Sequence, residues 1–243
     1  MKLDLIARGN PDSPTKILFL HGGPGMGPSY FLPYFDGLAK DAELFFYTQG
    51  SSGADTIEGL VDEIDAALPH CRGGHIFILG HSFGGSLALE YVKRRGADAL
   101  DGLILVSWVH EMKAGHFEDY KDDEDFRAKT AAIADQYFSP SHVDEGRKIL
   151  SASSYNLSLH HKINETFFNA FSSASVLKQL DRPILSVAGT DDHVVSLAHV
   201  RRGCGFNSKI KAVEISDAGH FPFVEKREEV LAAIREFVLK NEA

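Results

Sequence analysis

Ser82 stands in a setting that suits a nucleophile. It lies in the run Gly-His-Ser-Phe-Gly-Gly, residues 80–85, with a glycine two positions before it and another two positions after it. The apolar residues 76–79 predict a buried strand before this run, and good helix formers from residue 87 onward predict a helix after it. A serine at so sharp a turn projects its hydroxyl out of the sheet, and glycine neighbours leave room for the close approach. The spacing therefore predicts a serine held for attack on a carbonyl carbon.

Two later segments could supply the base and the acid that such a serine needs. Asp191 and Asp192 follow the apolar run 184–188, and His220 follows the apolar run 211–215. A hydroxyl is a weak nucleophile at neutral pH until a neighbouring histidine takes its proton, and a carboxylate then fixes the tautomer of that histidine. On residue type alone, either aspartate can fill this position. Serine, acid and histidine thus occur in that order, each after a predicted strand.

A glycine-rich loop follows the predicted strand at 17–20. Residues 21–28 read His-Gly-Gly-Pro-Gly-Met-Gly-Pro, a composition that continues neither a strand nor a helix. Such a loop exposes backbone N–H groups, which suit an anion or the oxyanion of a tetrahedral intermediate. A plain connecting loop is the alternative that composition alone allows.

Strands and helices that could position these groups alternate along the chain. The pattern at 2–8 predicts a half-exposed edge strand, and apolar runs predict buried strands at 17–20, 44–47, 76–79, 103–106, 184–188 and 211–215. Helical spacing predicts helices directly after Ser82 and at 29–40, 57–68 and 227–240. This alternation predicts an α/β fold whose mostly parallel sheet carries helices on both faces. Ligands of such sheets bind beyond the carboxyl ends of the strands, which is where all three motifs lie.

The alternation stops in the middle of the chain. Residues 110–182 contain no convincing buried strand and instead predict helices at about 118–138, 141–152 and 162–174. We therefore expect residues 110–182 to form a small helical cap, inserted into a core domain made of residues 1–109 and 183–243. The acidic run 119–125 predicts a solvated helix face or, alternatively, carboxylates that face the site and attract a cationic group of the substrate.

Composition excludes several classes of protein. The 243 residues carry a formal charge of −9, which argues against a surface for nucleic acid or for an anionic membrane. No apolar run approaches the roughly 18–20 residues of a membrane span. Cys71 and Cys204 are too few for a disulfide framework, so we expect a reduced, cytoplasmic location. The histidines show no metal-ligand spacing, so we expect no metal or organic cofactor, and a small-molecule substrate as the partner.

Four motifs together resemble the α/β-hydrolase superfamily. Each follows a predicted strand, and they are the loop 21–25, the elbow 80–85, the turn 189–192 and the segment 219–222. The order of serine, acid and histidine is also the order usual in that superfamily. The resemblance implies the α/β-hydrolase fold and a serine hydrolase.

The resemblance also implies roles for individual residues. It implies a catalytic triad of Ser82, Asp192 and His220. Asp192 is expected as the acid because it stands three residues after Gly189, the usual offset in the superfamily, while the adjacent Asp191 stays an alternative. Two backbone N–H groups are implied as the oxyanion hole, those of Gly23 and Phe83.

Three further residues are expected beside the substrate. His21 begins the glycine-rich loop, and Trp108 and Met112 stand where the cap begins. We therefore expect the substrate pocket to include His21, Trp108 and Met112. The alternatives are that His21 orients its loop and that Trp108 and Met112 pack the cap.

The sequence identifies the class of substrate less specifically than the class of reaction. The His-Gly-Gly-Pro-Gly loop is similar to that of proline iminopeptidases, and the acidic cap is compatible with binding of a substrate amine. Two features depart from that family: residues 48–53 read Thr-Gln-Gly-Ser-Ser-Gly instead of Asp-Gln-Arg-Gly-x-Gly, and the elbow carries His81 and Phe83 instead of glycine and tryptophan. We therefore expect hydrolysis of a small carboxylic ester or related acyl substrate. The alternatives are an iminopeptidase-like aminopeptidase and a non-catalytic protein that binds small molecules.

Overall fold

A seven-stranded sheet organises the protein. The computed structural model describes residues 2–113, 119–168 and 170–242. The strands lie in the order β1-β3-β2-β4-β5-β8-β9, with bounds Leu5–Gly9, Glu43–Tyr47, Thr15–Leu20, His75–His81, Gly102–Val106, Ile184–Gly189 and Ile210–Ile215. Strand β1 is antiparallel to β3, and all the other pairs are parallel. The structure therefore confirms the α/β fold with a mostly parallel sheet.

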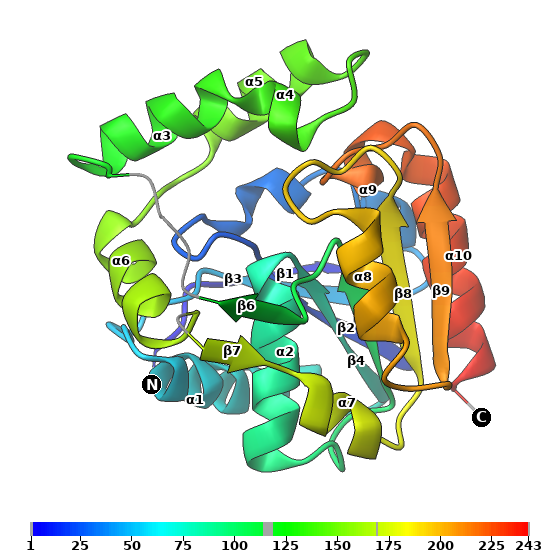
Figure 1. Ribbon diagram of the computed structural model, residues 1–243. Helices are drawn as coiled ribbons and strands as arrows, with labels where there is room; N and C mark the ends of the chain where they lie inside the picture. Colours follow the sequence, from blue (N-terminus) through cyan, green and yellow to red (C-terminus); the bar gives the residue numbers. More distant parts are fainter. Residues whose placement is uncertain (1, 114–118, 169, 243) are drawn as a thin grey trace.

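Helices cover both faces of this sheet (Figure 1). Side chains alternate along the strands, so that Leu18 and Leu20 belong to one buried cluster while Ile17 and Phe19 belong to the other. The first cluster lies under α1 (Ile57–Ala67), α2 (Phe83–Arg95), α7 (Ala174–Gln179) and α8 (Leu197–Cys204). The second lies under α9 (Pro222–Glu225) and α10 (Arg227–Lys240). Burial on both faces explains the near-continuous apolar runs of the central strands.

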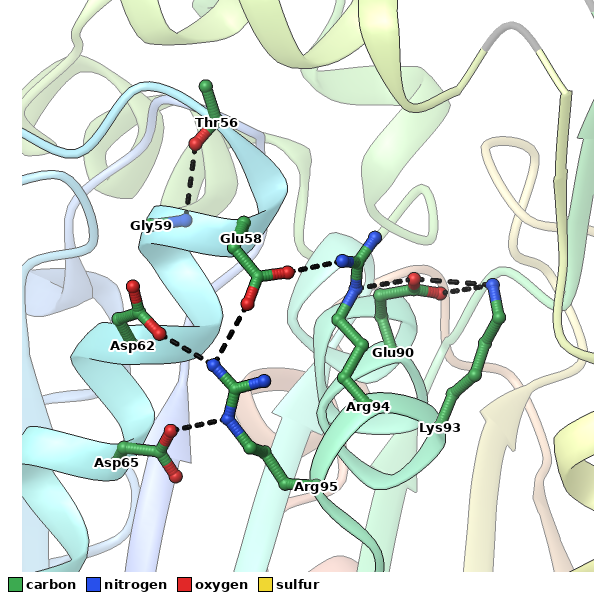
Figure 2. Close-up of polar contacts among 9 residues, drawn as sticks. All are labelled: Thr56, Glu58, Gly59, Asp62, Asp65, Glu90, Lys93, Arg94 and Arg95. Atoms are coloured by element: carbon green, nitrogen blue, oxygen red, sulfur yellow. Dashed lines mark hydrogen bonds and ion pairs between the residues drawn. The ribbon is translucent and has the colours of Figure 1, made fainter.

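An ion-pair network joins α1 to α2 on the outside of the molecule (Figure 2). The Arg95 guanidinium contacts Asp65 and Asp62 at 2.6 Å each and Glu58 at 2.9 Å. Arg94 contacts Glu58 as well, and its Nε lies 2.8 Å from a Glu90 oxygen. Exposed ion pairs are individually weak, but these share partners and link two helices. The network thus helps to orient α2, the helix that begins directly after Ser82.

The predicted helix at 29–40 is wrong. The segment forms two short 3₁₀ turns instead, η1 (Pro28–Phe31) and η2 (Asp36–Leu38). Pro33 lies between them and has no N–H to donate to a helical hydrogen bond. The apolar residues nevertheless pack inward, since the rings of Phe31 and Phe35 lie 5.3 and 4.9 Å from the Phe19 ring.

The insertion between β5 and β8 carries helices, as expected. They are α3 (Asp123–Ala132), α4 (Ala134–Tyr137), α5 (Val143–Ala152) and α6 (Leu157–Thr166). In Figure 1 the first three lie above the sheet, and the fourth lies at its left side. Three details differ from the prediction. The helix expected at 162–174 is displaced toward the N-terminus, since α6 ends at Thr166 and residues 170–172 are extended. The three-residue strands β6 (Glu111–Lys113) and β7 (Ala170–Ser172) form an antiparallel pair, which is too short to leave a pattern in the sequence. In addition, α7 packs against α2, so the end of the interval 110–182 lies with the sheet.

The predicted helix at 118–138 and the acidic run within it are only partly described, because Glu118 lies outside the described residues. In the described part, Asp122 accepts a hydrogen bond from the Asp125 N–H and caps α3, while Asp123 accepts from the N–H of Leu157 at 2.7 Å. The Asp125 carboxylate pairs with Lys129 at 2.9 Å. These carboxylates cap α3 and join it to α6. Among the described helices, none is long and apolar enough to cross a membrane.

Candidate active site

The turn that carries Ser82 is strained and crowded. Ser82 has φ 55° and ψ −119°, a backbone conformation that L-residues rarely adopt, between β4 and α2. A Cβ on Gly80 would lie 2.4 Å from the Gly84 carbonyl oxygen, and a Cβ on Gly84 would lie 2.0 Å from that of Leu20. Both glycines are therefore required by the close approach of strand and helix. The structure has the sharp turn that the spacing of glycines predicts.

His220 and Asp192 lie together at the ends of β9 and β8. The His220 Nδ1–H donates to Asp192 Oδ2 at 2.8 Å, and both side chains are buried. Asp192 Oδ1 accepts from the N–H groups of Val194 and Val195 at 2.9 and 2.7 Å. Because an ionised carboxylate only accepts, the hydrogen on a neutral His220 ring stays at Nδ1 and Nε2 is left as an acceptor.

Asp191 is placed differently from Asp192. Its Oδ1 accepts a hydrogen bond from the Thr190 hydroxyl at 3.0 Å, and its N–H donates to the Ala218 carbonyl. Within the described residues, it makes no hydrogen bond to His220. The structure thus brings Asp192, and not Asp191, to the histidine.

Ser82 opens into a cavity of about 540 Å³. The wall combines both suggested oxyanion residues with residues from β6, the Asp192 loop and α8: Gly23, Ser82, Phe83, Val109, Glu111, Met112, Phe168, His193, Val194, Val195, Ser196, His199 and Arg202. Met112 therefore lies in the wall, as expected. Within the described chain, no hydrogen bond joins the Ser82 hydroxyl to His220; such contacts often tighten only when substrate is bound.

The expectation that His21 and Trp108 line the pocket is wrong. Both side chains are fully buried beneath the site. The Trp108 Nε1–H donates to the Ser186 hydroxyl at 2.9 Å. His21 Nε2 accepts from the Gln49 N–H at 2.9 Å, and its Nδ1–H donates to the Gly22 carbonyl at 3.0 Å. Burial lowers the pKa of His21 to about 4, so the neutral ring holds two loops together.

Gly23 and Phe83 both face the cavity. Gly23 has φ 123°, and a Cβ there would lie 2.7 Å from the Gly25 nitrogen, so only glycine allows this loop path. In the described part of the chain, the N–H groups of these two residues make no hydrogen bond to another protein group. They are therefore free to donate to an oxygen in the cavity.

A buried polar chain that sequence reasoning missed connects the glycine-rich loop to the histidine. The Gly22 N–H donates to the Tyr30 hydroxyl at 2.5 Å, and that hydroxyl lies 2.8 Å from His81 Nδ1. His81 Nε2 lies 2.9 Å from the His220 carbonyl oxygen, which can only accept, so Nε2 carries the hydrogen and Nδ1 accepts from Tyr30. Burial holds the pKa of His81 well below its usual range, which keeps this ring neutral. No local pattern marks Tyr30 for this role.

The inserted segment also holds the glycine-rich loop. The Gly27 N–H donates to the Ser154 carbonyl at 3.0 Å, and the Asn156 N–H donates to the Gly25 carbonyl at 2.7 Å. His160 on α6 contributes a further contact, 3.0 Å from its Nδ1 to the Pro24 carbonyl. The inserted segment and Tyr30 therefore hold the loop that carries Gly23 through separate contacts.

Replacing Tyr30 with phenylalanine should loosen the site without removing any reacting group. The Gly22 N–H and His81 Nδ1 would lose their partner, so we expect a loss of stability of about 1–3 kcal/mol. Displacement of the loop and of His220 should lower kcat by about 10- to 100-fold, with a much smaller change in KM. Thermal unfolding and steady-state kinetics measure the two effects.

Tyr34→Phe is the matched control, because the Tyr34 hydroxyl donates to Glu145 near the surface, at 3.0 Å. It should change stability by less than about 0.5 kcal/mol and leave kcat as it is. Equal kcat values for Tyr30→Phe and the wild type would contradict a positioning role for Tyr30.

Helix α8, which forms one wall of the cavity, was also not predicted. Ser196 accepts a hydrogen bond from the His199 N–H at 3.3 Å and so caps the helix. That capping serine was the signal available in the sequence. In the described ranges, no group of three or more His, Cys, Asp or Glu side chains is arranged to hold a metal ion.

Comparison with known proteins identifies the family of this chain. The model of the alpha/beta hydrolase family matches residues 17–233. A proline iminopeptidase of Lactobacillus acidophilus is 22% identical over 98% of this chain and 94% of its own length. A proline iminopeptidase of Thermoplasma volcanium is 36% identical over 37% of this chain, an alignment that spans only 34% of that relative.

Solved structures agree on the fold. An esterase from Rhodococcus sp. ECU1013 superposes with a TM-score of 0.79 and 22% identity, covering 98% of this chain and 94% of that one. A thermophilic esterase from Thermogutta terrifontis gives a TM-score of 0.77 and 21% identity, covering 99% and 94%. The family match extends from β2 into α10 and includes the elbow, the acid turn and the histidine. The chain belongs to the alpha/beta hydrolase family.

Proposed function

We propose that this protein is a serine hydrolase that cleaves small carboxylic esters or related acyl substrates. The observation that carries the proposal is the buried pair of His220 and Asp192, 2.8 Å apart, whose histidine ring packs against His81. His81 directly precedes the strained Ser82, which opens into a cavity. Membership of a hydrolase family supports the reaction class.

The proposed reaction begins with Ser82. His220 Nε2 takes the hydroxyl proton while the Ser82 oxygen attacks the ester carbonyl carbon, and Asp192 stabilises the resulting imidazolium. The N–H groups of Gly23 and Phe83 donate to the oxyanion. Collapse of the intermediate breaks the bond to the leaving alcohol, which takes the proton from His220, and an acyl-enzyme remains. His220 then activates a water molecule, whose attack releases the acid and restores Ser82.

An iminopeptidase-like activity is the second candidate, because relatives with that name align with this chain. Such an enzyme would need carboxylates to hold the amine of an N-terminal proline. In the part of the chain that the structure describes, Glu111 is the carboxylate that lines the cavity, whereas the described members of the acidic cap run cap and link helices. This placement favours the ester hydrolase. A non-catalytic binding protein is the third candidate, and the presence of a complete set of reacting groups disfavours it.

Matched substrates separate the first two candidates. We expect β-naphthyl esters of short acids to be hydrolysed, and the β-naphthylamides of proline and of cyclopentanecarboxylic acid to differ by less than about tenfold in kcat/KM. These two amides share the ring shape, but only proline carries the cationic amine. A preference for the proline amide of more than about 100-fold would instead identify an amine-binding aminopeptidase. Release of naphthol or naphthylamine is measured by fluorescence.

A further inference from the structure

One wall of the cavity carries polar side chains that take no part in the proposed reaction. Helix α8 runs along this wall and presents His199 and Arg202, which lie three residues apart and therefore on the same side of the helix. Gly203 allows the helix to lie close to the strand end, since a Cβ there would come within 2.6 Å of the Trp108 ring and 2.9 Å of the His110 Cβ. The two side chains are thus held by a tightly packed helix.

His199 is a neutral ring whose tautomer is determined by its neighbours. The His110 N–H donates to His199 Nε2 at 3.1 Å, so the ring hydrogen must lie on Nδ1. Partial burial, with the adjacent His110 ring and the Arg202 charge, lowers the pKa of His199 to about 4. The His110 and His199 rings also contact each other with centroids 4.1 Å apart. His199 therefore offers the cavity one N–H donor at Nδ1 and no positive charge at neutral pH.

Arg202 is a cation with no acidic partner among the described residues. The neighbouring Arg201 differs, since its guanidinium makes two 2.7 Å contacts to the Glu214 carboxylate. Arg202 makes no such ion pair and lines the cavity. A guanidinium in that position presents a planar set of N–H donors that matches a carboxylate.

We propose that the cavity binds acyl groups that end in a carboxylate, with Arg202 and the Nδ1–H of His199 as the donors to that carboxylate. The inference rests on the proposed ester hydrolysis, because the ester carbonyl would lie at Ser82 while the distal carboxylate lies against α8. The substrates would be monoesters of dicarboxylic acids. Hydrolysis consumes one water and releases the alcohol and a dicarboxylate.

The cavity also contains an opposing charge. Glu111 lies in the same wall. Burial lowers the pKa of His110, the Glu111 charge opposes this shift and the Arg202 charge adds to it, so both charges act on one histidine pair. The buried Asp192 is occupied by His220 and by two backbone N–H groups. Arg202 and the His199 Nδ1–H are two donors for an anion, whereas Glu111 is the one carboxylate of the described wall that could attract a cation. This balance favours an anionic over a cationic acyl group. Removal of the Glu111 charge should therefore strengthen binding of the anion.

Ethyl esters with and without a distal carboxylate test the inference. Monoethyl succinate, glutarate and adipate are compared with ethyl butanoate, pentanoate and hexanoate, and released ethanol is measured. We expect kcat/KM for at least one monoester to exceed that of its neutral partner by about 10- to 100-fold, the range of charge-assisted hydrogen bonds. Arg202→Gln should bring this ratio to about one, and Glu111→Gln should raise it several-fold. Arg201→Gln is the matched control and should leave the ratio unchanged.

The outcomes separate the inference from the proposed function. If neutral esters are hydrolysed but no monoester is preferred, or if Arg202→Gln keeps the preference, the inference is wrong and ester hydrolysis stands. Preference for ethyl 6-aminohexanoate, lost in Glu111→Gln, would overturn it in favour of a cationic acyl group. If no ester is hydrolysed, the proposed function fails. Calorimetry with monoethyl adipate then decides the inference, which requires binding that Arg202→Gln weakens and Arg201→Gln does not.

Discussion

Replacing Ser82 with alanine should lower kcat/KM for esters by about 10⁵-fold and abolish covalent labelling by a fluorophosphonate probe. Ser82 Oγ is the atom that the proposed reaction joins to the acyl group, so its loss removes the first step. The fold should survive, because alanine meets the same backbone strain as serine at φ 55° and leaves the packing of Gly80 and Gly84 intact. Mass spectrometry of the probe adduct and circular dichroism measure labelling and folding.

Ser107 provides a matched control for this experiment. It also has a positive φ, 47°, at the end of the neighbouring strand β5, and its N–H donates to a neighbouring strand as that of Ser82 does. Its side chain is fully buried, and its hydroxyl has no hydrogen-bond partner in the described structure. Ser107→Ala should therefore keep probe labelling and ester turnover. A folded wild-type protein that fails to label, or a labelled Ser82→Ala variant, would show that Ser82 is not the nucleophile.

Replacing Asp192 with asparagine should lower kcat by about 10⁴-fold while leaving the fold in place. The side-chain oxygen of asparagine can still accept from the N–H groups of Val194 and Val195, which Asp192 Oδ1 now does. The NH₂ group would then face His220 Nδ1 and force the ring hydrogen to Nε2. A histidine in that tautomer cannot take the proton of Ser82. Pre-steady-state kinetics should show the loss in the acylation step.

Asp191→Asn is the corresponding control. Asp191 accepts a hydrogen bond from Thr190 and makes no hydrogen bond to His220 in the described structure, and an asparagine oxygen can also accept that bond. We expect kcat within about threefold of the wild type, as for other substitutions away from reacting groups. If Asp191→Asn is the crippled variant and Asp192→Asn is active, the acid in the proposed triad is wrong.

The local patterns around the strands were enough to predict the fold. Runs such as 77–79 and 184–188 are buried on both faces, and burial of that kind leaves an uninterrupted apolar signal in the sequence. The helix predicted at 29–40 failed because Pro33 interrupts a segment whose apolar residues are buried by aromatic packing and not by a helical face. Strands β6 and β7 were missed because three residues cannot display an alternation.

The sequence by itself determined which groups the proposed chemistry could use: a serine in a glycine-bounded turn, with a histidine and two candidate carboxylates after later strands. Only the tertiary structure decided which carboxylate meets His220, because Asp191 and Asp192 are neighbours in sequence but point to different partners. The tertiary structure also determined which residues line the cavity, since α8 places His199 and Arg202 in the same cavity as Ser82. Contacts such as that between His81 and His220 join residues 139 positions apart, and a local pattern holds no information about such distant pairs.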